Sequence, residues 1–370
     1  MAQDVSVRSD HPDRYIVVKG DTLWDIAGRF LDKPWQWPAI WHVNPQVANP
    51  HLIYPGDELS LVYIDGVPQL RLSREDTVKL SPQVRVVSRQ DPINAIPLDS
   101  LEPFLREVRV LSPSEFEGLP YVLANEEKRI TATYSDQTYA RGLKGNVGDE
   151  FTVMRLYSIY DRVEEGAEVR RVLPKEHWKQ VPNVKDRNET MWNDTLPWQR
   201  RPQNPVAYEL IEVSRVRMAQ SGEISVLDII RDRTEVREGD YILPVDSRGY
   251  DATFYPHAMD SVPEGMRVLA TKDSLYGVGH FQIVALSAGS RQGVESGHVF
   301  SVFRPGATVD DRTGYRYGSF AEESRVALPD RFHGMVMVFR TFDDISYAMV
   351  MSGDHPIREF DKLKHPDERT

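Results

Sequence analysis

The sequence contains no cysteine among its 370 residues. This absence excludes disulfide scaffolds, thiolate metal sites and cysteine nucleophiles. It does not identify a compartment, because reducing and oxidising environments both suit a protein without thiols. The chain also lacks an apolar run long enough to span a bilayer as a helix, so we expect no transmembrane segment. Its polar beginning, MAQDVSVRSDHPDR, lacks the apolar core of a signal peptide.

An excess of basic residues is missing as well. The formal net charge is -11, whereas non-specific nucleic-acid binding needs a basic surface. We therefore expect no nucleic-acid partner. With 40% hydrophobic and 27% charged residues, the composition is typical of a soluble globular protein with two or three domains.

Catalytic motifs are absent too. The ten histidines are scattered without the HExxH pattern of a zinc peptidase, and there is no nucleophile elbow of a serine hydrolase. Residues 294–297 (VESG) superficially resemble the Glu-Ser of lytic transglycosylases, but they lie in a glycine-rich turn between strand patterns. The acidic pairs Glu164-Glu165 and Glu322-Glu323 are typical of solvated loops. We predict a protein that is not an enzyme and that holds no metal or cofactor.

The N-terminal residues, by contrast, carry a compact pattern. Residues 15–18 (YIVV) predict a strand by their β-propensity, and residues 19–21 (KGD) predict a turn. Thr22 is a good helix N-cap, and Asp25 three residues later completes a capping-box pattern. A helix is then indicated by apolar residues at one-face spacing: Leu23, Ile26, Ala27, Phe30 and Leu31.

A second helix and a second strand complete this unit. Pro34 ends the first helix, and Pro38 suits the first position of the next one. Asn44-Pro45 ends that helix, and the loop QVANPHLIYPGD leads to a strand over Glu58 to Tyr63. The order predicts a βααβ domain whose two strands pair antiparallel.

This pattern resembles the LysM domain over about residues 13–63. YIVVKGDTLWDIA and NPHLIYPGDELSL stand in the order and spacing of that family, which binds glycans containing N-acetylglucosamine, mainly peptidoglycan and chitin. The segment from Asp32 to Ala39 (DKPWQWPA) departs from the family pattern because it is longer and richer in tryptophan.

The resemblance implies a shallow glycan groove between two loops. Gly20 permits close backbone approach, and free amides at the helix start can donate hydrogen bonds to sugar oxygens. Apolar side chains can cover an N-acetyl methyl group. Carried onto this sequence, the groove residues are Gly20, Asp21, Thr22, Leu23, Asn49, Pro50, His51, Leu52 and Ile53.

Several of these residues have simpler explanations. Thr22 and Asp25 cap the helix whether or not a ligand binds, and His51 fits an ordinary loop residue better than a ligand contact. Trp24 lies beside the core stripe, either at the groove edge or packed under the tryptophan-rich insert, and we favour packing. For so small a domain, we expect the remaining N-terminal tryptophans to be core residues: Trp35, Trp37 and Trp41.

The rest of the chain is predicted to be β-rich. Residues 64–100 indicate a connector with one candidate strand at 84–87. Two similar patterns follow, over residues 101–245 and 246–370, with endings REGDYI and REFDKL. Their alternation predicts short antiparallel strands and an internal duplication. An insertion over 161–205 carries tryptophans that suit either a protein interface or a weakly ordered loop. The predicted fold class is α+β.

The layout as a whole resembles the secretin-associated protein family of bacterial type IV pili, whose C-terminal region is similar to a flagellar outer-ring protein. This resemblance implies a periplasmic protein, here in a mature form without its signal peptide. It implies that several copies anchor an outer-membrane secretin ring to peptidoglycan through a non-catalytic N-terminal domain. The alternatives are a wall-remodelling hydrolase with an unrecognised active site and a cytoplasmic LysM protein.

Overall fold

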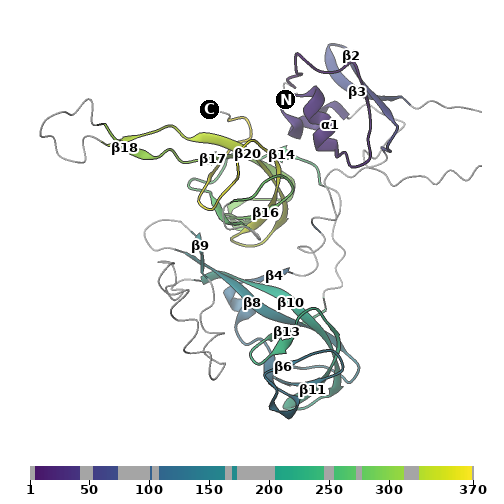
Figure 1. Ribbon diagram of the computed structural model, residues 1–370, viewed down its shortest axis with the longest axis vertical. Helices are drawn as coiled ribbons and strands as arrows, with labels where there is room; N and C mark the ends of the chain where they lie inside the picture. Colours follow the sequence, from purple (N-terminus) through teal and green to yellow (C-terminus); the bar gives the residue numbers. More distant parts are fainter. Residues whose placement is uncertain are drawn as a thin grey trace, which may run out of the picture.

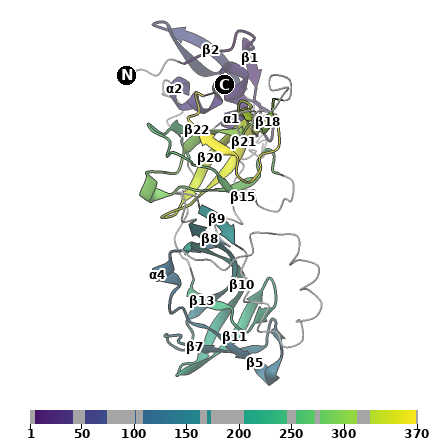
Figure 2. The same ribbon diagram turned by 90° about the vertical axis from the view of Figure 1, so that its left-hand side faces the viewer.

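The protein is mostly β and divides into a small N-terminal unit (residues 5–73), a first barrel (108–245) and a second barrel (254–368). Barrel 2 lies between the N-terminal unit and barrel 1 (Figure 2). The computed structural model describes residues 5–41, 53–73, 101, 108–162, 169–172, 205–245, 254–271, 277–311 and 325–368.

The N-terminal unit packs short helices against a three-stranded antiparallel sheet. The predicted pairing of its first two strands is confirmed, because Tyr15 of β1 lies opposite Leu59 of β2. The second helix begins at Trp37, one residue before the predicted start. The elements are β1 (Arg14–Ile16), α1 (Leu23–Phe30), the 3-10 helix η1 (Pro34–Gln36), α2 (Trp37–Trp41), β2 (Glu58–Ile64) and β3 (Val67–Ser73).

Strand β3 corrects the start of the predicted connector over residues 64–100. Residues 67–73 are no connector, because β3 forms a hairpin with β2 and buries Leu70 in the core of this unit. Asp65 and Gly66 make the two-residue turn, both with positive φ (52° and 81°). Asp-Gly is a preferred pair for such a turn. The candidate strand at 84–87 lies outside the described residues.

Barrel 1 is a closed sheet of six strands in the order β5-β7-β11-β10-β8-β13, and β13 returns to β5. Strands β8 and β10 run on beyond the barrel, where β4 and β9 join them (Figure 1). We call this extension the β8–β10 ribbon. The elements are β4 (Val108–Leu111), α4 (Pro113–Phe116), β5 (Tyr121–Asn125), η2 (Glu126–Lys128), β6 (Thr131–Ala132), β7 (Gln137–Arg141), β8 (Glu150–Arg162), β9 (Val169–Val172), β10 (Pro205–Gln220), β11 (Ile224–Asp232), β12 (Val236–Arg237) and β13 (Tyr241–Pro244).

Barrel 2 has the same strand order, β15-β16-β21-β20-β17-β22. It closes where the Val268 N–H donates to the carbonyl of Asp361 at 2.9 Å and the Phe360 N–H donates to the carbonyl of Val268 at 2.8 Å. The elements are β14 (His257–Ala258), β15 (Val268–Thr271), β16 (Ile283–Leu286), η4 (Ser290–Gln292), β17 (His298–Arg304), β18 (Thr308–Asp310), β19 (Arg325–Ala327), β20 (Arg331–Thr341), β21 (Ser346–Gly353) and β22 (Lys362–Lys364).

Both barrels carry an excursion at the same point of the topology. In barrel 1 the β8–β10 connection contains the predicted insertion, of which residues 163–168 and 173–204 lie outside the described part. In barrel 2 the β17–β20 connection forms the β18–β19 ribbon, which projects from the barrel (Figure 1). A long excursion at this point is therefore common to both barrels, whereas the sequence predicts an insertion in the first alone.

A buried arginine–aspartate pair closes each barrel. The Arg155 guanidinium donates two hydrogen bonds to Asp240, at 2.8 and 2.7 Å, and the Arg237 N–H donates a third. In barrel 2, Arg304 donates to both carboxylate oxygens of Asp361, and the Arg358 N–H donates there as well. The two aspartates stand at the fourth position of the REGD and REFD endings, which explains why those endings are alike.

The outer faces of the barrels differ in chemistry. On barrel 1 the cross-strand pair between β10 and β11 is Arg217 with Asp228, and Arg217 is exposed. Between β20 and β21 of barrel 2 the cross-strand pair is Met337 with Met349, 1% and 0% exposed. Burial alternates along β11, but most of β20 and β21 is buried on both faces. The predicted alternation therefore fails in barrel 2, because other parts of the chain cover its outer face.

Two neighbours cover that face. Trp24 and Trp35 of the N-terminal unit belong to the same hydrophobic cluster as Met337 and Met349. Tyr160 and Val206 of the β8–β10 ribbon belong to it too. One continuous apolar cluster thus joins all three parts, in addition to a separate core inside each of them.

Candidate functional site

The first predicted groove loop is a tight turn between β1 and α1. The Asp21 N–H donates to the Val18 carbonyl at 3.1 Å, and the Asp21 carboxylate accepts from the Val18 N–H and the Tyr15 hydroxyl, both at 2.8 Å. Gly20 has φ 98°, which suits the third position of a type II turn and favours glycine. A Cβ built on Gly20 would meet nothing within 4 Å. The loop is therefore rigid and open above Gly20.

The predicted capping box at Thr22 and Asp25 is confirmed. The Asp25 N–H donates to Thr22 Oγ1 at 3.2 Å. Asp25 Oδ2 accepts from the Thr22 N–H at 3.2 Å and from the Thr22 hydroxyl at 2.7 Å. Because these bonds already engage the polar groups of Thr22, its side chain contributes to the loop as a cap.

The apolar residues predicted for the groove lie under it. Leu23 and Ile53 are 3% and 0% exposed and belong to the core of the N-terminal unit. They support the loop from inside, which leaves the covering of a bound sugar to other residues. The remaining predicted residues, Asn49, Pro50, His51 and Leu52, lie outside the described part. The groove assignment as a whole stays a prediction.

The tryptophan-rich departure has a structural explanation. As favoured from the sequence, Trp24 is packed with Trp35 of the insert, and both are 2% exposed. Their partners, however, lie largely on the outer face of barrel 2. Trp37 also contacts Tyr255, with ring centroids 5.9 Å apart, and Lys33 pairs with Asp367 at 2.6 Å. The extra residues of the insert thus attach the N-terminal unit to barrel 2.

One group of possible metal ligands is not evident from the spacing of its residues in the sequence. His257, Glu295 and His298 place ligand atoms within 4.8 Å of one another. The Glu295 N–H, however, donates to His298 Nδ1 at 3.0 Å. A neutral His298 ring then carries its proton on Nε2, so neither nitrogen offers a free lone pair. The group does not fit a metal centre, and His298 is a structural residue at the start of β17.

Because two histidines are buried, we expect the folded protein to become less stable in acid. Burial lowers the pKa of His298, and nearby His257 lowers it further, against opposing effects of Glu295 and Asp260. Burial also lowers the pKa of His333. The unfolded chain therefore takes up protons first, so stability should be full above a pH of about 6.5 and decline as the pH falls toward the lowered folded values.

Denaturant unfolding at about pH 7.5 and about pH 5 measures this decline. His298→Asn keeps an acceptor near the position of Nδ1 but does not titrate. We expect this variant to lose less stability on acidification than the wild type. An equal loss in both proteins would contradict the assignment of part of the decline to His298.

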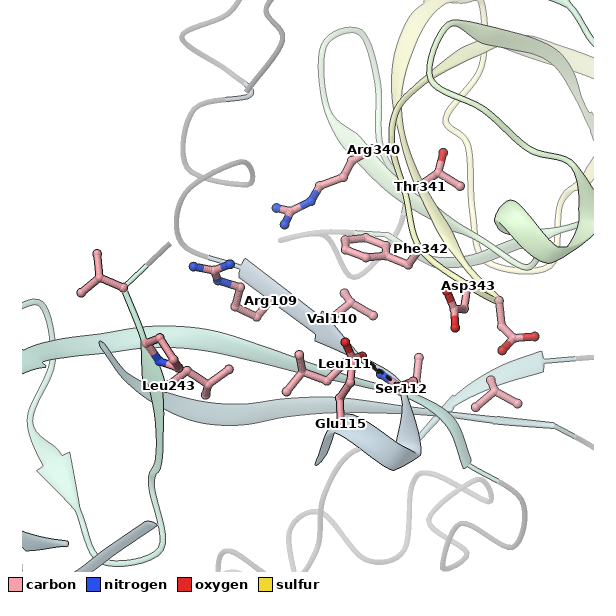
Figure 3. Close-up of a pocket in the computed structure, with 15 residues that line it drawn as sticks. Arg109, Val110, Leu111, Ser112, Glu115, Leu243, Arg340, Thr341, Phe342 and Asp343 are labelled. Carbon is pink, nitrogen blue, oxygen red and sulfur yellow. Dashed lines mark hydrogen bonds between the residues drawn. The ribbon is translucent and has the colours of Figure 1, made fainter. Parts of the chain in front are cut away.

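A cavity of about 610 Å³ lies between the two barrels. Figure 3 shows Arg340 and Phe342 of barrel 2 on one side and Arg109 and Val110 of β4 on the other. Four of its charged residues are engaged in structural contacts: Glu115, Arg340, Asp343 and Asp344. Arg340 donates to the Val108 carbonyl at 3.2 Å, and Glu115 accepts from the Ser112 N–H at 2.8 Å. This cavity belongs to the contact between the barrels.

Comparison with known proteins identifies the N-terminal unit. Residues 15–62 match the LysM domain family. This segment is a LysM domain. A stretch of 60 residues is also 40% identical to the uncharacterized protein YqbP of Bacillus subtilis (strain 168). That similarity covers 14% of this chain and 27% of YqbP, so the chain spans about a quarter of the length of this curated relative.

LysM is a binding module, and its presence supports a peptidoglycan-binding role for this chain. Among the described residues, no helix combines the length and the apolar character needed to span a membrane. Glu295, whose sequence context superficially resembles that of a transglycosylase glutamate, is exposed and lies in the turn before β17.

Proposed function

We propose that this protein is a non-catalytic anchor that attaches an outer-membrane secretin ring of the type IV pilus machinery to peptidoglycan. The observation that carries the proposal is a LysM domain docked through Trp24 and Trp35 onto the second of two β-barrels. In this arrangement the LysM domain holds the cell wall, and the barrels bind the secretin. The anchor works in the periplasm.

The secretin-binding role of the barrels is supported by their exposed surfaces. On the β18–β19 ribbon, Val309 lies opposite Val326, and these side chains are 41% and 47% exposed. Leu328, which follows β19, is 46% exposed. An isolated two-stranded ribbon is marginally stable in water, so a ribbon that projects from a barrel and exposes a pair of valines suits contact with another protein.

We further infer that the barrels arose by an internal duplication. The common strand order and the matching pairs Arg155–Asp240 and Arg304–Asp361 support this inference. One copy then retained a polar outer face, with Arg217 and Asp228, and the other evolved an apolar face that the LysM domain covers.

Multivalency explains how a weak glycan site could hold a large machine. A shallow groove binds a single glycan weakly, but several copies on one ring act together, and the gain in avidity is of the order of 10² to 10⁴. Copies that lack the LysM domain could still bind the ring, but they would not bind peptidoglycan. The proposal therefore separates the two binding activities between two parts of the chain.

Co-purification with the secretin tests this separation. The full chain should recover both secretin and peptidoglycan sacculi, and a chain lacking residues 1–73 should recover secretin alone. The deletion exposes the apolar outer face of barrel 2, so circular dichroism and thermal unfolding should confirm that the shortened chain is still folded. A folded, shortened chain that loses the secretin would refute the assignment of secretin binding to the barrels.

A further inference from the structure

The contact between the LysM domain and barrel 2 lies next to the predicted glycan loop. Nε2 of His280, in barrel 2, is 4.0 Å from Oδ1 of Asp25 in the first turn of α1. The other carboxylate oxygen of Asp25 binds the N–H and the hydroxyl of Thr22. The Asp25 carboxylate therefore lies between the imidazole of His280 and the backbone of the Gly20–Leu23 loop.

The two groups are placed to share a hydroxyl group. A separation of 4.0 Å exceeds a hydrogen bond, for which about 2.7–3.2 Å is usual. A hydroxyl oxygen at about 2.8 Å from each group would fit between them, donating to the carboxylate and interacting with the imidazole. Both side chains are open to such a group, since 46% of His280 and 33% of Asp25 is exposed.

The turn that carries His280 is held rigidly. The Gly279 N–H donates to the side chain of Gln282 at 2.7 Å, and the Gln282 N–H donates to the Gly279 carbonyl at 3.1 Å. Phe281 has φ 62°, an unusual value for an aromatic residue, and its N–H donates to Val350 of β21 at 2.8 Å. Backbone strain of this kind is often found at binding sites.

The turn also stiffens the imidazole itself. The His280 ring stacks on Phe281 with centroids 3.6 Å apart and planes at 27°. Phe281 is in turn partly buried against the cluster that holds Trp24. A fixed, half-exposed ring with a polar edge can pack against a sugar ring and bond to one of its hydroxyl groups.

We propose that His280 of barrel 2 is a glycan-binding residue, so that the peptidoglycan site spans the LysM domain and barrel 2. His280 and Asp25 hold one hydroxyl group of a sugar that continues beyond the Gly20–Leu23 loop. This inference rests on the proposed glycan-binding function of the LysM domain. It gives barrel 2 a direct part in wall binding as well as in docking.

Titration calorimetry of the full chain with a soluble N-acetylglucosamine oligomer tests the proposal. His280→Ala should weaken binding about fivefold, as expected for the loss of one hydrogen bond. His280→Gln places an amide nitrogen near the position of Nε2 and should restore most of the affinity. His355→Ala is the control, because that barrel 2 histidine contacts Arg331 and His333 instead of the LysM domain.

The possible results separate the two proposals. Wild-type affinity in His280→Ala would overturn the role of His280 and leave glycan binding by the LysM domain intact. An equal loss in His280→Ala and His280→Gln, with a lowered melting temperature, would reduce His280 to a docking residue and also overturn the proposal. No binding of oligomers or sacculi by the wild type would overturn the proposed function itself.

Discussion

Replacing Asp361 with alanine is expected to lower the free energy of unfolding of barrel 2 by about 3–5 kcal/mol. The carboxylate is 1% exposed and satisfies both the Arg304 guanidinium and the Arg358 N–H. Removing the carboxylate leaves the Arg304 guanidinium, which is 27% exposed, without its counter-charge and next to a small buried cavity. Because Asp240 has the same arrangement with Arg155, Asp240→Ala should destabilise barrel 1 by a similar amount.

Denaturant unfolding of the full chain measures both effects. Asp310→Ala is the matched control, since Asp310 and Arg325 form an exposed pair at 3.9 Å in the same barrel. Exposed pairs contribute little, so this variant should unfold like the wild type. If Asp361→Ala and Asp310→Ala had equal midpoints, the buried pair would not be the closing contact that the geometry indicates.

Replacing Gly20 with leucine should reduce binding to sacculi at least tenfold. The left-handed conformation at this position strains any side chain, at a cost of about 1–2 kcal/mol. The added side chain also projects into the open space above the loop, where a glycan must approach the backbone. The loss of binding should therefore exceed what the loss of stability alone produces.

Gly148→Leu separates strain from blocked binding. Gly148 lies in barrel 1 with φ 96°, close to the 98° of Gly20, and neither has an atom within 4 Å of an added Cβ. The two variants should be destabilised alike, and only Gly20→Leu should lose the sacculi in a sedimentation assay. Equal sedimentation of both variants would place the glycan site elsewhere.

The parts of the fold that depend on neighbouring residues could be predicted from the sequence. The capping box of Thr22 and Asp25 is complete within four residues, and the structure contains it. The hairpin turn at Asp65-Gly66 is equally local, but the proline-rich residues that follow it favour a linker. Local patterns thus predicted the elements of the LysM domain itself more reliably than the strand β3 that follows it.

The parts that depend on distant residues could not be predicted. The sequence favours packing of Trp24 under the tryptophan-rich insert, but it does not show that barrel 2 residues belong to the same cluster. The sequence does not show that Met337 and Met349 lie on the outer face of barrel 2. A strand that is buried on both faces is a continuous apolar run, so its inward and outward residues look alike. His280 is ordinary in its own sequence context, and only the docking of the two parts brings it to Asp25.

The most direct test of the anchor is incubation of the intact protein with purified peptidoglycan sacculi, followed by sedimentation and chromatography of the supernatant. The account predicts that the protein sediments with the sacculi and that no soluble wall fragments are released. Protein that stays in the supernatant would contradict glycan binding. Release of soluble fragments that is abolished by replacing a single carboxylate would contradict the anchor and identify a wall hydrolase instead.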